Sequence, residues 1–347
     1  MNINYVISIM KKICETPSPS GWTNAAMNIV KEELESFGIN TSFTNKGSLS
    51  ALIPGKNPTP NKALAAHIDT LGAMVKKIKD NGRIAFTPIG GYTMSSIECE
   101  NCFIHTANNS IYTGTVYSIK PSVHIHEDCK TLERNLENME IVIDEKVSSA
   151  DDVQNLGIEV GDFITFDPRF QYTNSGFIKS RHLDDKACVA ILLGLCKHIM
   201  DNKITLEDSV QILITNYEEV GHGASVGLIP SIKELLCLDM GAPGTGQNSS
   251  EYSVSICAKD SGGPYDFSLR NHLVELARNN NIDYKVDIYP HYGSDAGAAI
   301  RSGFDIKFGL IGPGIYASHS YERTHKDSIA NTAELALKYI LSKPLNY

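Results

Sequence analysis

Hydrophobic residues recur at helical spacing near the start of the chain. Residues 3–14 predict a short helix, and the apolar face that runs from Ala26 to Phe37 predicts a second one. Residues 48–53 and 63–68 are short apolar runs of the length typical of buried strands. The chain therefore begins with alternating helices and strands.

The pattern changes between residues 72 and 174, where strand-like runs dominate and long helical periodicity is nearly absent. The runs cover residues 73–79, 83–89, 111–119, 140–143 and 163–166. Asp80-Asn81-Gly82 lies between the first two runs and is a hairpin turn signal. We therefore predict a β-rich domain, residues 72–174, inserted into an α/β domain that residues 1–71 and 175–347 form together.

After residue 175, strands and helices alternate again. Strands are predicted at residues 210–215, 235–238, 284–289 and 306–311, and helices at residues 187–199, 267–278, 294–301 and 330–341. Residues 187–199 are apolar on nearly every face, which predicts a buried helix. The alternation predicts a mixed, mostly parallel sheet covered on both faces, in which functional residues collect where strands end.

Composition and charge narrow the function classes. The 347 residues are 42% apolar and 20% charged, with a net charge of −9, which argues against binding to nucleic acid or to an anionic membrane. The N-terminus lacks the pattern of a secretory signal, and the longest apolar run, Cys188–Cys196, is too short to span a bilayer. Eight cysteines are scattered without a framework spacing, so we expect a cytoplasmic protein with free thiols.

Five acidic or histidine patches interrupt or end apolar stretches of the chain. They are His67-x-Asp69, Asp184-Asp185, Glu218-Glu219, Asp239 and His319. A protein buries so many ionisable groups only when they are paired or coordinate metal. The patches therefore predict a site for two adjacent divalent metals, with one spare carboxylate that acts as a base.

His67 and Asp69 end a predicted strand and project to the same side of it. Asp69 is placed to fix the ring and tautomer of His67, or to steady a reacting group. Taken alone, a hydrogen-bonded histidine at a strand end is the simpler interpretation of this pair.

Two carboxylate pairs follow. Asp184-Asp185 precedes the buried helix, where aspartates commonly act as caps. We interpret Asp185 as such a cap and Asp184 as the better candidate for a carboxylate shared by two metals. Glu218 and Glu219 would repel each other unless a cation lies between them. One would then ligate while its neighbour takes a proton from bound water, and a plain solvated pair is the alternative.

Asp239 ends the predicted strand at residues 235–238. His319 lies in a loop after the strand at residues 306–311, and His325 is a rival ligand in the same loop. Together with the other patches, these residues put acids or histidines at four strand ends of one α/β domain. Parallel strand order brings such ends to one edge of a sheet.

Two other patterns indicate different chemistry. Asp260-Ser261-Gly262-Gly263-Pro264 matches the nucleophile loop of trypsin-like serine proteases, and Ala65-Ala66-His67 matches their histidine site. That fold is all-β, so we favour a tight loop near the site. Cys99, Cys102 and Cys129 with nearby histidines are candidates for a structural zinc site, but free thiols fit their spacing better.

Six short motifs occur in a fixed order along almost the whole chain. They are Ala66-His67-Ile68-Asp69, Leu183-Asp184-Asp185-Lys186, Glu218-Glu219-Val220-Gly221, Leu238-Asp239, Gly293-Ser294-Asp295-Ala296-Gly297 and His319-Ser320. As a set they resemble the cocatalytic-metal aminopeptidases of the tetrahedral (TET) and glutamyl aminopeptidase type. The resemblance implies an α/β fold with a three-layer α/β/α peptidase domain and an inserted, β-barrel-like dimerisation domain.

The resemblance also implies a role for each candidate residue. The metal ligands would be His67 and Asp239 for one ion, Glu219 and His319 for the other, and Asp184 for both. Glu218 would be the general base that takes a proton from a metal-bridged water, and Asp69 would support His67. The enzyme would remove N-terminal residues from short peptides with two divalent metal ions per subunit. Zinc is the first choice, with cobalt and manganese as alternatives.

The same resemblance implies a homo-oligomer with a dimer as its building block and, in many members, twelve subunits. The chain departs from the pattern of the family at two places, which involve three residues. Thr70 stands where an acidic residue is usual, and Asp185-Lys186 stands where Asn-Arg is usual. Neither departure removes a predicted ligand. Both lie beside the expected metals, so the metal preference, the rate and the substrate range of the enzyme stay open.

Three alternative functions are kept. One is another metallohydrolase of the same broad fold, either an acyl-amino acid deacylase or a carboxypeptidase-like enzyme. Another is a glucanase, which would need two carboxylates flanking a sugar and no metal. The third is a non-catalytic peptide-binding homologue, against which the complete ligand set argues. The preferred N-terminal residue and the oligomeric state stay open.

Overall fold

A nine-stranded mixed sheet forms the centre of the larger domain in the computed structural model, which describes residues 1–345. The strands run in the order β1-β2-β12-β3-β13-β17-β14-β15, and β16 pairs with β14. Their bounds are Thr41–Phe43 (β1), Leu49–Ile53 (β2), Gly55–His67 (β3), Leu206–Thr215 (β12), Glu234–Leu238 (β13), Val254–Asp260 (β14), Gly263–Pro264 (β15), Tyr284–Ile288 (β16) and Lys307–Pro313 (β17). β12, β3, β13 and β17 are joined by parallel pairings, so their carboxyl ends lie at one edge.

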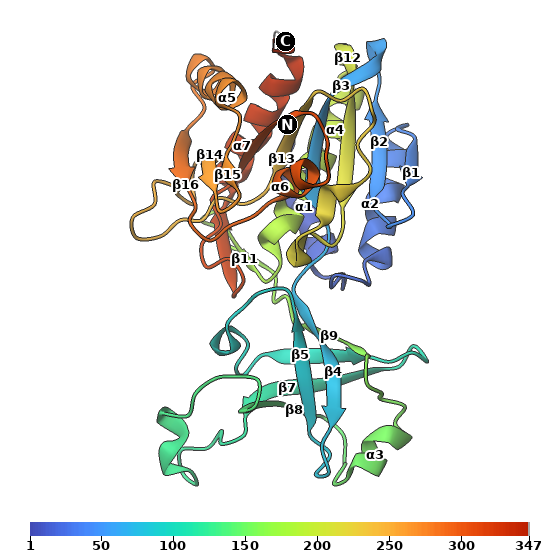
Figure 1. Ribbon diagram of the computed structural model, residues 1–347, viewed down its shortest axis with the longest axis vertical. Helices are drawn as coiled ribbons and strands as arrows, with labels where there is room; N and C mark the ends of the chain where they lie inside the picture. The colour runs from blue at the N-terminus through green and yellow to red at the C-terminus, as the bar shows by residue number, and fades with distance from the viewer. Residues whose placement is uncertain (346–347) are drawn as a thin grey trace.

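Helices cover both faces of this sheet (Figure 1). One face packs against α1 (Ile3–Cys14), α2 (Asn24–Ser36), α4 (Leu183–Asp201), α5 (Phe267–Asn279) and α7 (Lys326–Leu341), and the other against α6 (Asp295–Arg301) and loops. Side chains of β3 alternate between the two faces of the sheet. Leu64 and Ala66 belong to the core under the first group of helices, and Ala63 and Ala65 belong to the core under α6. The predicted α/β fold with a mixed sheet is confirmed.

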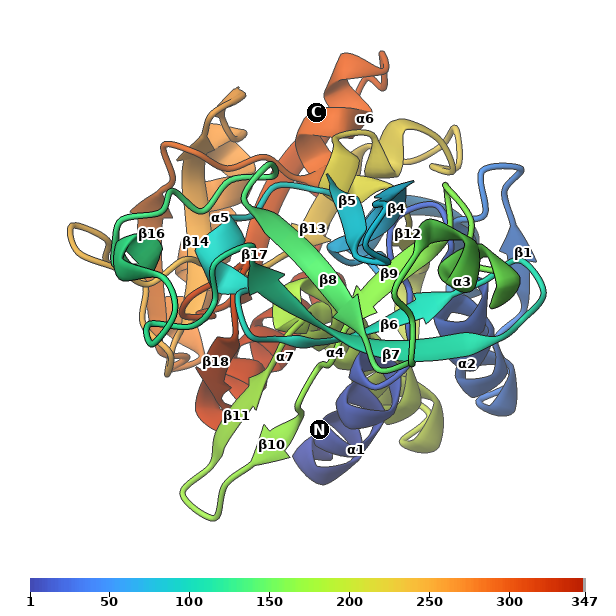
Figure 2. The ribbon, with the colours of Figure 1, turned by 90° about the horizontal axis from the view of Figure 1, so that it is seen from below.

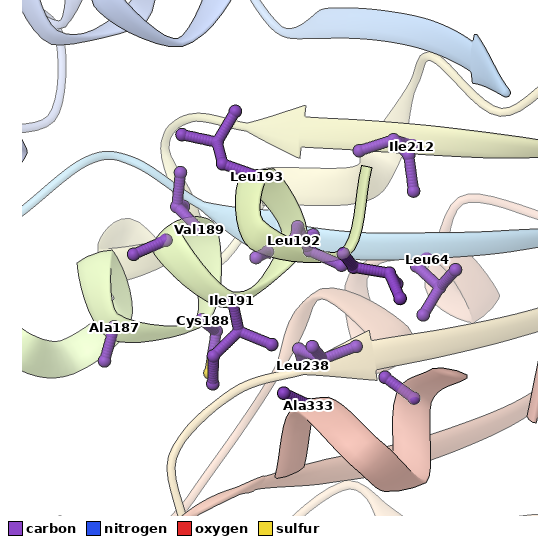
Figure 3. Packing of buried hydrophobic residues seen from close by; sticks show 14 of the residues in the cluster. Leu64, Ala187, Cys188, Val189, Ile191, Leu192, Leu193, Ile212, Leu238 and Ala333 are labelled. Atoms are coloured by element: carbon purple, nitrogen blue, oxygen red, sulfur yellow. The ribbon is translucent and has the colours of Figure 1, made fainter. Parts of the chain in front are cut away.

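α4 is the central helix of the first layer. Its residues Ala187–Cys196 are all buried, as the apolar pattern on every face predicts. Figure 3 shows Leu192 and Ile191 of this helix packed in one cluster with Leu64 and Leu238 of the sheet. The start of α4 is thereby fixed near the carboxyl ends of the central strands.

A closed antiparallel barrel forms the second domain, with its own apolar core. Its strand order is β4-β5-β8-β7-β6-β9, and the bounds are Gly72–Ile78 (β4), Ile84–Ile89 (β5), Asn101–His105 (β6), Ile111–Ser118 (β7), Met139–Ile143 (β8) and Phe163–Phe166 (β9). One short helix, α3 (Ala150–Asn155), lies at its far end from the larger domain (Figure 1). The barrel projects from the larger domain in Figure 1, and Figure 2 shows it from below, in front of that domain.

The chain leaves the barrel through a small three-stranded sheet of β10 (Gln171–Tyr172), β11 (Phe177–Ser180) and β18 (Glu322–His325). Arg181 follows β11 and is buried between the two domains. Its guanidinium donates to the carbonyl oxygen of Ser96, which belongs to the barrel, and forms an ion pair with Glu100 at 3.2 Å. Among residues 1–345, no helix is both long and apolar enough to cross a membrane.

Candidate functional site

The carboxyl ends of the four parallel strands carry the predicted ligands. β3 ends on His67, and β13 is followed directly by Asp239. The loops after β12 and β17 carry Glu219 and His319. Asp184 reaches the same edge from the start of α4. Because β12, β3, β13 and β17 are neighbours in the sheet, residues far apart in the sequence meet at one place.

These five residues form two groups whose potential ligand atoms lie within 4.8 Å of one another. The groups are His67, Asp184 and Asp239, and Asp184, Glu219 and His319. Asp184 belongs to both: its Oδ1 lies 3.3 Å from Nε2 of His67, and its Oδ2 lies 3.4 Å from Nε2 of His319. Nε2 of His319 is also 3.4 Å from Oε2 of Glu219. One carboxylate thus faces both groups, as an ion-bridging ligand must.

Both histidines have a defined tautomer. Nδ1 of His67 bonds to the carbonyl oxygen of Asp69 at 3.0 Å, and Nδ1 of His319 bonds to the carbonyl oxygen of Gly91. A carbonyl oxygen only accepts, so each Nδ1 carries a hydrogen and each Nε2 is directed to the carboxylates. This is how proteins usually orient a metal-binding histidine.

The electrostatics of the site are those of crowded, buried carboxylates, whose pKa values are raised. Burial, with the charge of Asp184, raises the pKa of Asp239 to about 8, and burial raises the pKa of Glu218 and Glu219 well above the usual range. Burial alone would lower the pKa of His319, but its bond to Asp184 raises that pKa to about 11. One buried oxygen of Glu219 has no hydrogen-bond partner among the described residues. Crowded carboxylates with an orphaned oxygen are a donor set that suits divalent cations.

Asp69 connects His67 to the glutamate pair. Its carbonyl oxygen holds the His67 ring, whereas its carboxylate lies 3.7 Å from Nδ1 of that ring. The carboxylate instead accepts the backbone N–H groups of Glu218, at 3.1 Å, and Glu219, at 3.3 Å, and the hydroxyl of Ser20. Asp69 therefore supports the histidine through its main chain and the loop of the glutamates through its side chain.

Asp185 does not cap the helix, so this prediction is wrong. The residue is fully buried, and the peptide bond that joins it to Asp184 is cis. Its Oδ2 accepts the backbone N–H of His67 at 3.3 Å, and its Oδ1 has no hydrogen-bond partner among the described residues. The hydrogen bond to the backbone at the end of β3 explains an aspartate at this position.

The rival candidates lie elsewhere. His325 bonds through its ring to the carbonyl oxygen of Ser175 and to Asp327, at 2.9 and 3.2 Å. Residues 260–264 form the tight turn between β14 and β15, in which Oδ1 of Asp260 accepts two backbone N–H groups. Neither group of potential ligands includes a cysteine, and all eight cysteines are free thiols.

Two buried carboxylates at the site have no counterpart in the predictions from sequence. Glu322 accepts the backbone N–H of Asp184 at 3.0 Å and that of His319 at 3.1 Å. Asp295 accepts the N–H of Ala224 at 2.7 Å and the hydroxyl of Thr215 at 2.6 Å. Asp295 lies in one of the six motifs, but no pattern indicated its contacts.

A pocket of about 590 Å³ opens beside the ligands. Asp184, Glu218, Glu219, Asp239 and His319 form one wall, and mainly uncharged residues, among them Met240, Tyr289, Tyr292 and Ile315, form much of the rest. The site therefore combines a dense set of metal-ligating groups with room for a side chain of a substrate.

Comparisons with known proteins identify relatives of this chain. YhfE of Bacillus subtilis (strain 168), whose name marks its aminopeptidase activity as provisional, is 50% identical over 341 residues, which cover 98% of this chain and 99% of YhfE. The fold is similar to that of a TET aminopeptidase from Thaumarchaeota archaeon SCGC AB-539-E09, with a TM-score of 0.88, 20% identity and coverage of 97% of this chain and 96% of that one.

A second solved structure, the TET1 peptidase of Pyrococcus horikoshii, matches with a TM-score of 0.84, 21% identity and coverage of 97% of this chain and 100% of that one. The family model of the M42 glutamyl aminopeptidases matches residues 47–335, most of the chain and every predicted site residue. The chain therefore belongs to the M42 glutamyl aminopeptidase family, and the protein is a metallo-aminopeptidase, a hydrolase of peptide bonds.

Proposed function

We propose that the protein is a dinuclear-metal aminopeptidase that removes N-terminal residues from short peptides. His67 and Asp239 would hold one divalent ion, Glu219 and His319 the other, and Asp184 both. The observation that carries this proposal is the position of Asp184, whose two oxygens face two different histidines at 3.3 and 3.4 Å. The two ions, zinc first with cobalt and manganese as alternatives, would polarise the peptide carbonyl and lower the pKa of the attacking water.

Glu218 is the proposed general base. It is the carboxylate of the pocket wall that belongs to neither group of ligands, and its Oε2 lies 3.7 Å from Nε2 of His67. Its side chain is 14% exposed and faces the pocket, where it can reach a water and the leaving amine. It would take a proton from the water and deliver it to that amine. The carboxylate of Asp69 accepts the backbone N–H of Glu218 and so keeps Glu218 in place.

The variant Glu218→Gln tests this assignment. It keeps the shape of the side chain but removes the base, so we expect stoichiometric metal binding with a kcat lowered by about 10²–10⁴-fold. Glu207→Gln, a change at a side chain that is 79% exposed, is the matched control and should keep full activity. Wild-type hydrolysis of aminoacyl anilides by Glu218→Gln would show that another group is the base.

The metal requirement needs a separate experiment. Chelator-stripped protein would be supplied with zinc, cobalt or manganese and assayed on a panel of aminoacyl anilides, which also reveals the preferred N-terminal residue. We expect no hydrolysis without metal. Hydrolysis of cellulose that survives chelation would instead support the glucanase alternative.

We also propose that the inserted β-rich domain of residues 72–174, which contains the barrel, is a dimerisation domain and that dimers are the unit of a larger homo-oligomer. The Pyrococcus horikoshii TET1 peptidase, which shares the fold, is described as assembling into a tetrahedron or a large octahedral shell. Eight free thiols support a reducing, cytoplasmic location. Size-exclusion chromatography with light scattering would test the assembly, and a monomer at micromolar concentration would contradict it.

A further inference from the structure

A second cavity, of about 500 Å³, meets the candidate site from the side of the barrel. Segment 91–96, in the connection between β5 and β6, forms one wall, and residues 318–320 form the other. Ser318 and His319 line both this groove and the 590 Å³ pocket. The two spaces therefore meet at His319, beside the carboxylates that would hold the metals.

The two spaces differ in how closed they are. Buried side chains, including Met240, Tyr289 and Ile315, form the inner wall of the pocket. None of the residues that line the groove is buried, so the groove is open to solvent along its length. An aminopeptidase binds one residue before the scissile bond and a chain of variable length after it. The pocket with its buried inner wall suits the single residue, and the open groove suits the remaining chain.

The groove also has the chemistry to bind a peptide backbone. Its side chains are hydroxyl-bearing and uncharged apart from His319, so they would not select for charge. Thr93 has an extended backbone, with φ −83° and ψ 142°. Within residues 1–345, the backbone N–H groups of Tyr92 and Thr93 donate no hydrogen bond. The 3-10 turn Met94–Ser96 follows directly, and the two free N–H groups before it can donate to carbonyl oxygens of a bound peptide.

We propose that the groove between segments 91–96 and 318–320 binds the part of the substrate peptide that follows the scissile bond, mainly through its backbone. This inference rests on the proposed aminopeptidase function and assigns a substrate-binding role to the inserted barrel. Recognition of the backbone would make the enzyme tolerant of the residues that follow the first one.

The groove is fixed to the site by several bonds. The carbonyl oxygen of Gly91 accepts Nδ1–H of His319, and the hydroxyl of Tyr92 donates to the carbonyl oxygen of Gly72 at 2.8 Å. Arg181 donates to the carbonyl oxygens of Ser96 and Ser320, one from each wall. Segment 91–96 is therefore held in a fixed position relative to the proposed metal ligands, as a substrate-binding wall must be.

Blocking the groove tests the proposal. Ser95 is exposed in segment 91–96, and Ser95→Trp would fill the groove without changing a buried contact. The kcat/KM values would be measured for an aminoacyl anilide and for a tetrapeptide with the same first residue. We expect the ratio of tetrapeptide to anilide to fall at least tenfold in the variant. Ser148→Trp, at an exposed serine beside α3, is the matched control and should leave the ratio unchanged.

A binding measurement gives an independent readout. An N-acetylated tripeptide has no free amine to be processed and resembles the leaving part of a substrate. Titration calorimetry should show that Ser95→Trp binds it at least tenfold more weakly than the wild type and the control do. Equal losses for anilide and tetrapeptide, or unchanged affinity for the acetylated tripeptide, would overturn the groove assignment while the peptidase function stands. Absence of hydrolysis of any peptide by the metal-loaded wild type would instead refute the proposed function.

Discussion

Glu322 is a buried side chain whose partners are backbone groups of two proposed ligands. Glu322→Ala would leave the N–H groups of Asp184 and His319 without a partner, which we expect to lower the free energy of unfolding by about 2–5 kcal/mol. The looser ligands should bind metal about 10–100-fold more weakly. Metal titration by calorimetry and urea unfolding would measure the two effects.

Glu322→Gln is the conservative control for this prediction. It keeps one accepting oxygen and the volume of the side chain, so both losses should be smaller than in Glu322→Ala. Unchanged metal affinity in the alanine variant would mean that the two ligands are positioned without Glu322.

Gly223 lies against the glutamate loop. A Cβ at this position would come within 1.9 Å of Oδ1 of Asp295 and 3.1 Å of Cβ of Glu218. Asp295 cannot move easily because Thr215 and Ala224 hold both of its oxygens. We therefore expect Gly223→Ala to lower stability by about 1–3 kcal/mol and kcat by about 10²-fold, since the proposed base is displaced.

Steady-state kinetics and thermal unfolding would measure the effect of Gly223→Ala. Gly244→Ala is the control, because an added Cβ there meets nothing within 4 Å. Similar activity in the two variants would contradict a tight packing requirement at Gly223.

At the scale of single residues, the sequence indicated the groups that end apolar strands. His67 and Asp239 stand out because an ionisable residue follows a run of buried ones. Glu322 gave no such signal, and Asp185 was interpreted only as a helix cap. The backbone N–H groups of Asp184 and His67, which these two carboxylates accept, lie 138 and 118 residues away in the chain, and such contacts leave no local pattern.

At the scale of elements, long or strongly apolar segments were predicted well. α1 and β9 have the predicted bounds, and α4 is buried as expected. β3 begins at Gly55, earlier than predicted, because its first residues are exposed and pair with β12 through the backbone. The two-residue strands β10 and β15 exist only through pairing with neighbours, which no pattern of side chains encodes.

His105 on β6 gives a testable property of the contact between the two domains. Its ring lies 4.7 Å from that of Trp22, the single tryptophan of the chain, and its Nε2 is 2.9 Å from the hydroxyl of Thr165. Burial lowers its pKa to about 4. In the unfolded chain the ring of His105 binds a proton near pH 6.5. The contribution of the buried, neutral ring to the free energy of unfolding is therefore complete above that pH and is lost as the pH falls toward 4.

The variant His105→Gln should therefore lose less stability than the wild type between pH 6.5 and 4. The slope of its unfolding free energy against pH should correspond to up to one proton fewer taken up on unfolding. Urea unfolding followed by Trp22 fluorescence at several pH values would measure this slope. His124→Gln, at an exposed histidine of the barrel, is the control. Equal slopes for His105→Gln and the wild type would contradict the assignment.

At the scale of the whole molecule, metal binding should release protons. Asp239, with a pKa of about 8, and His319, with one of about 11, hold protons at neutral pH when no metal is bound. Metal must displace these protons, so we expect the apparent affinity to rise between pH 6 and 8, and the stabilisation by metal to rise with it. Calorimetry in two buffers of different ionisation enthalpy would count the protons, and an affinity independent of pH would contradict the expectation.

The hydrogen bond from His319 to the carbonyl oxygen of Gly91 bears on how the two domains can be exchanged between relatives. The histidine comes from one domain and its acceptor from the connection between β5 and β6 of the other. A chimera that received the barrel of another family member would also receive a new acceptor for this ring. The barrel is therefore not a neutral module, and a graft would preserve the metal site only if the junction at Gly91 were transferred or kept together with the loop of His319.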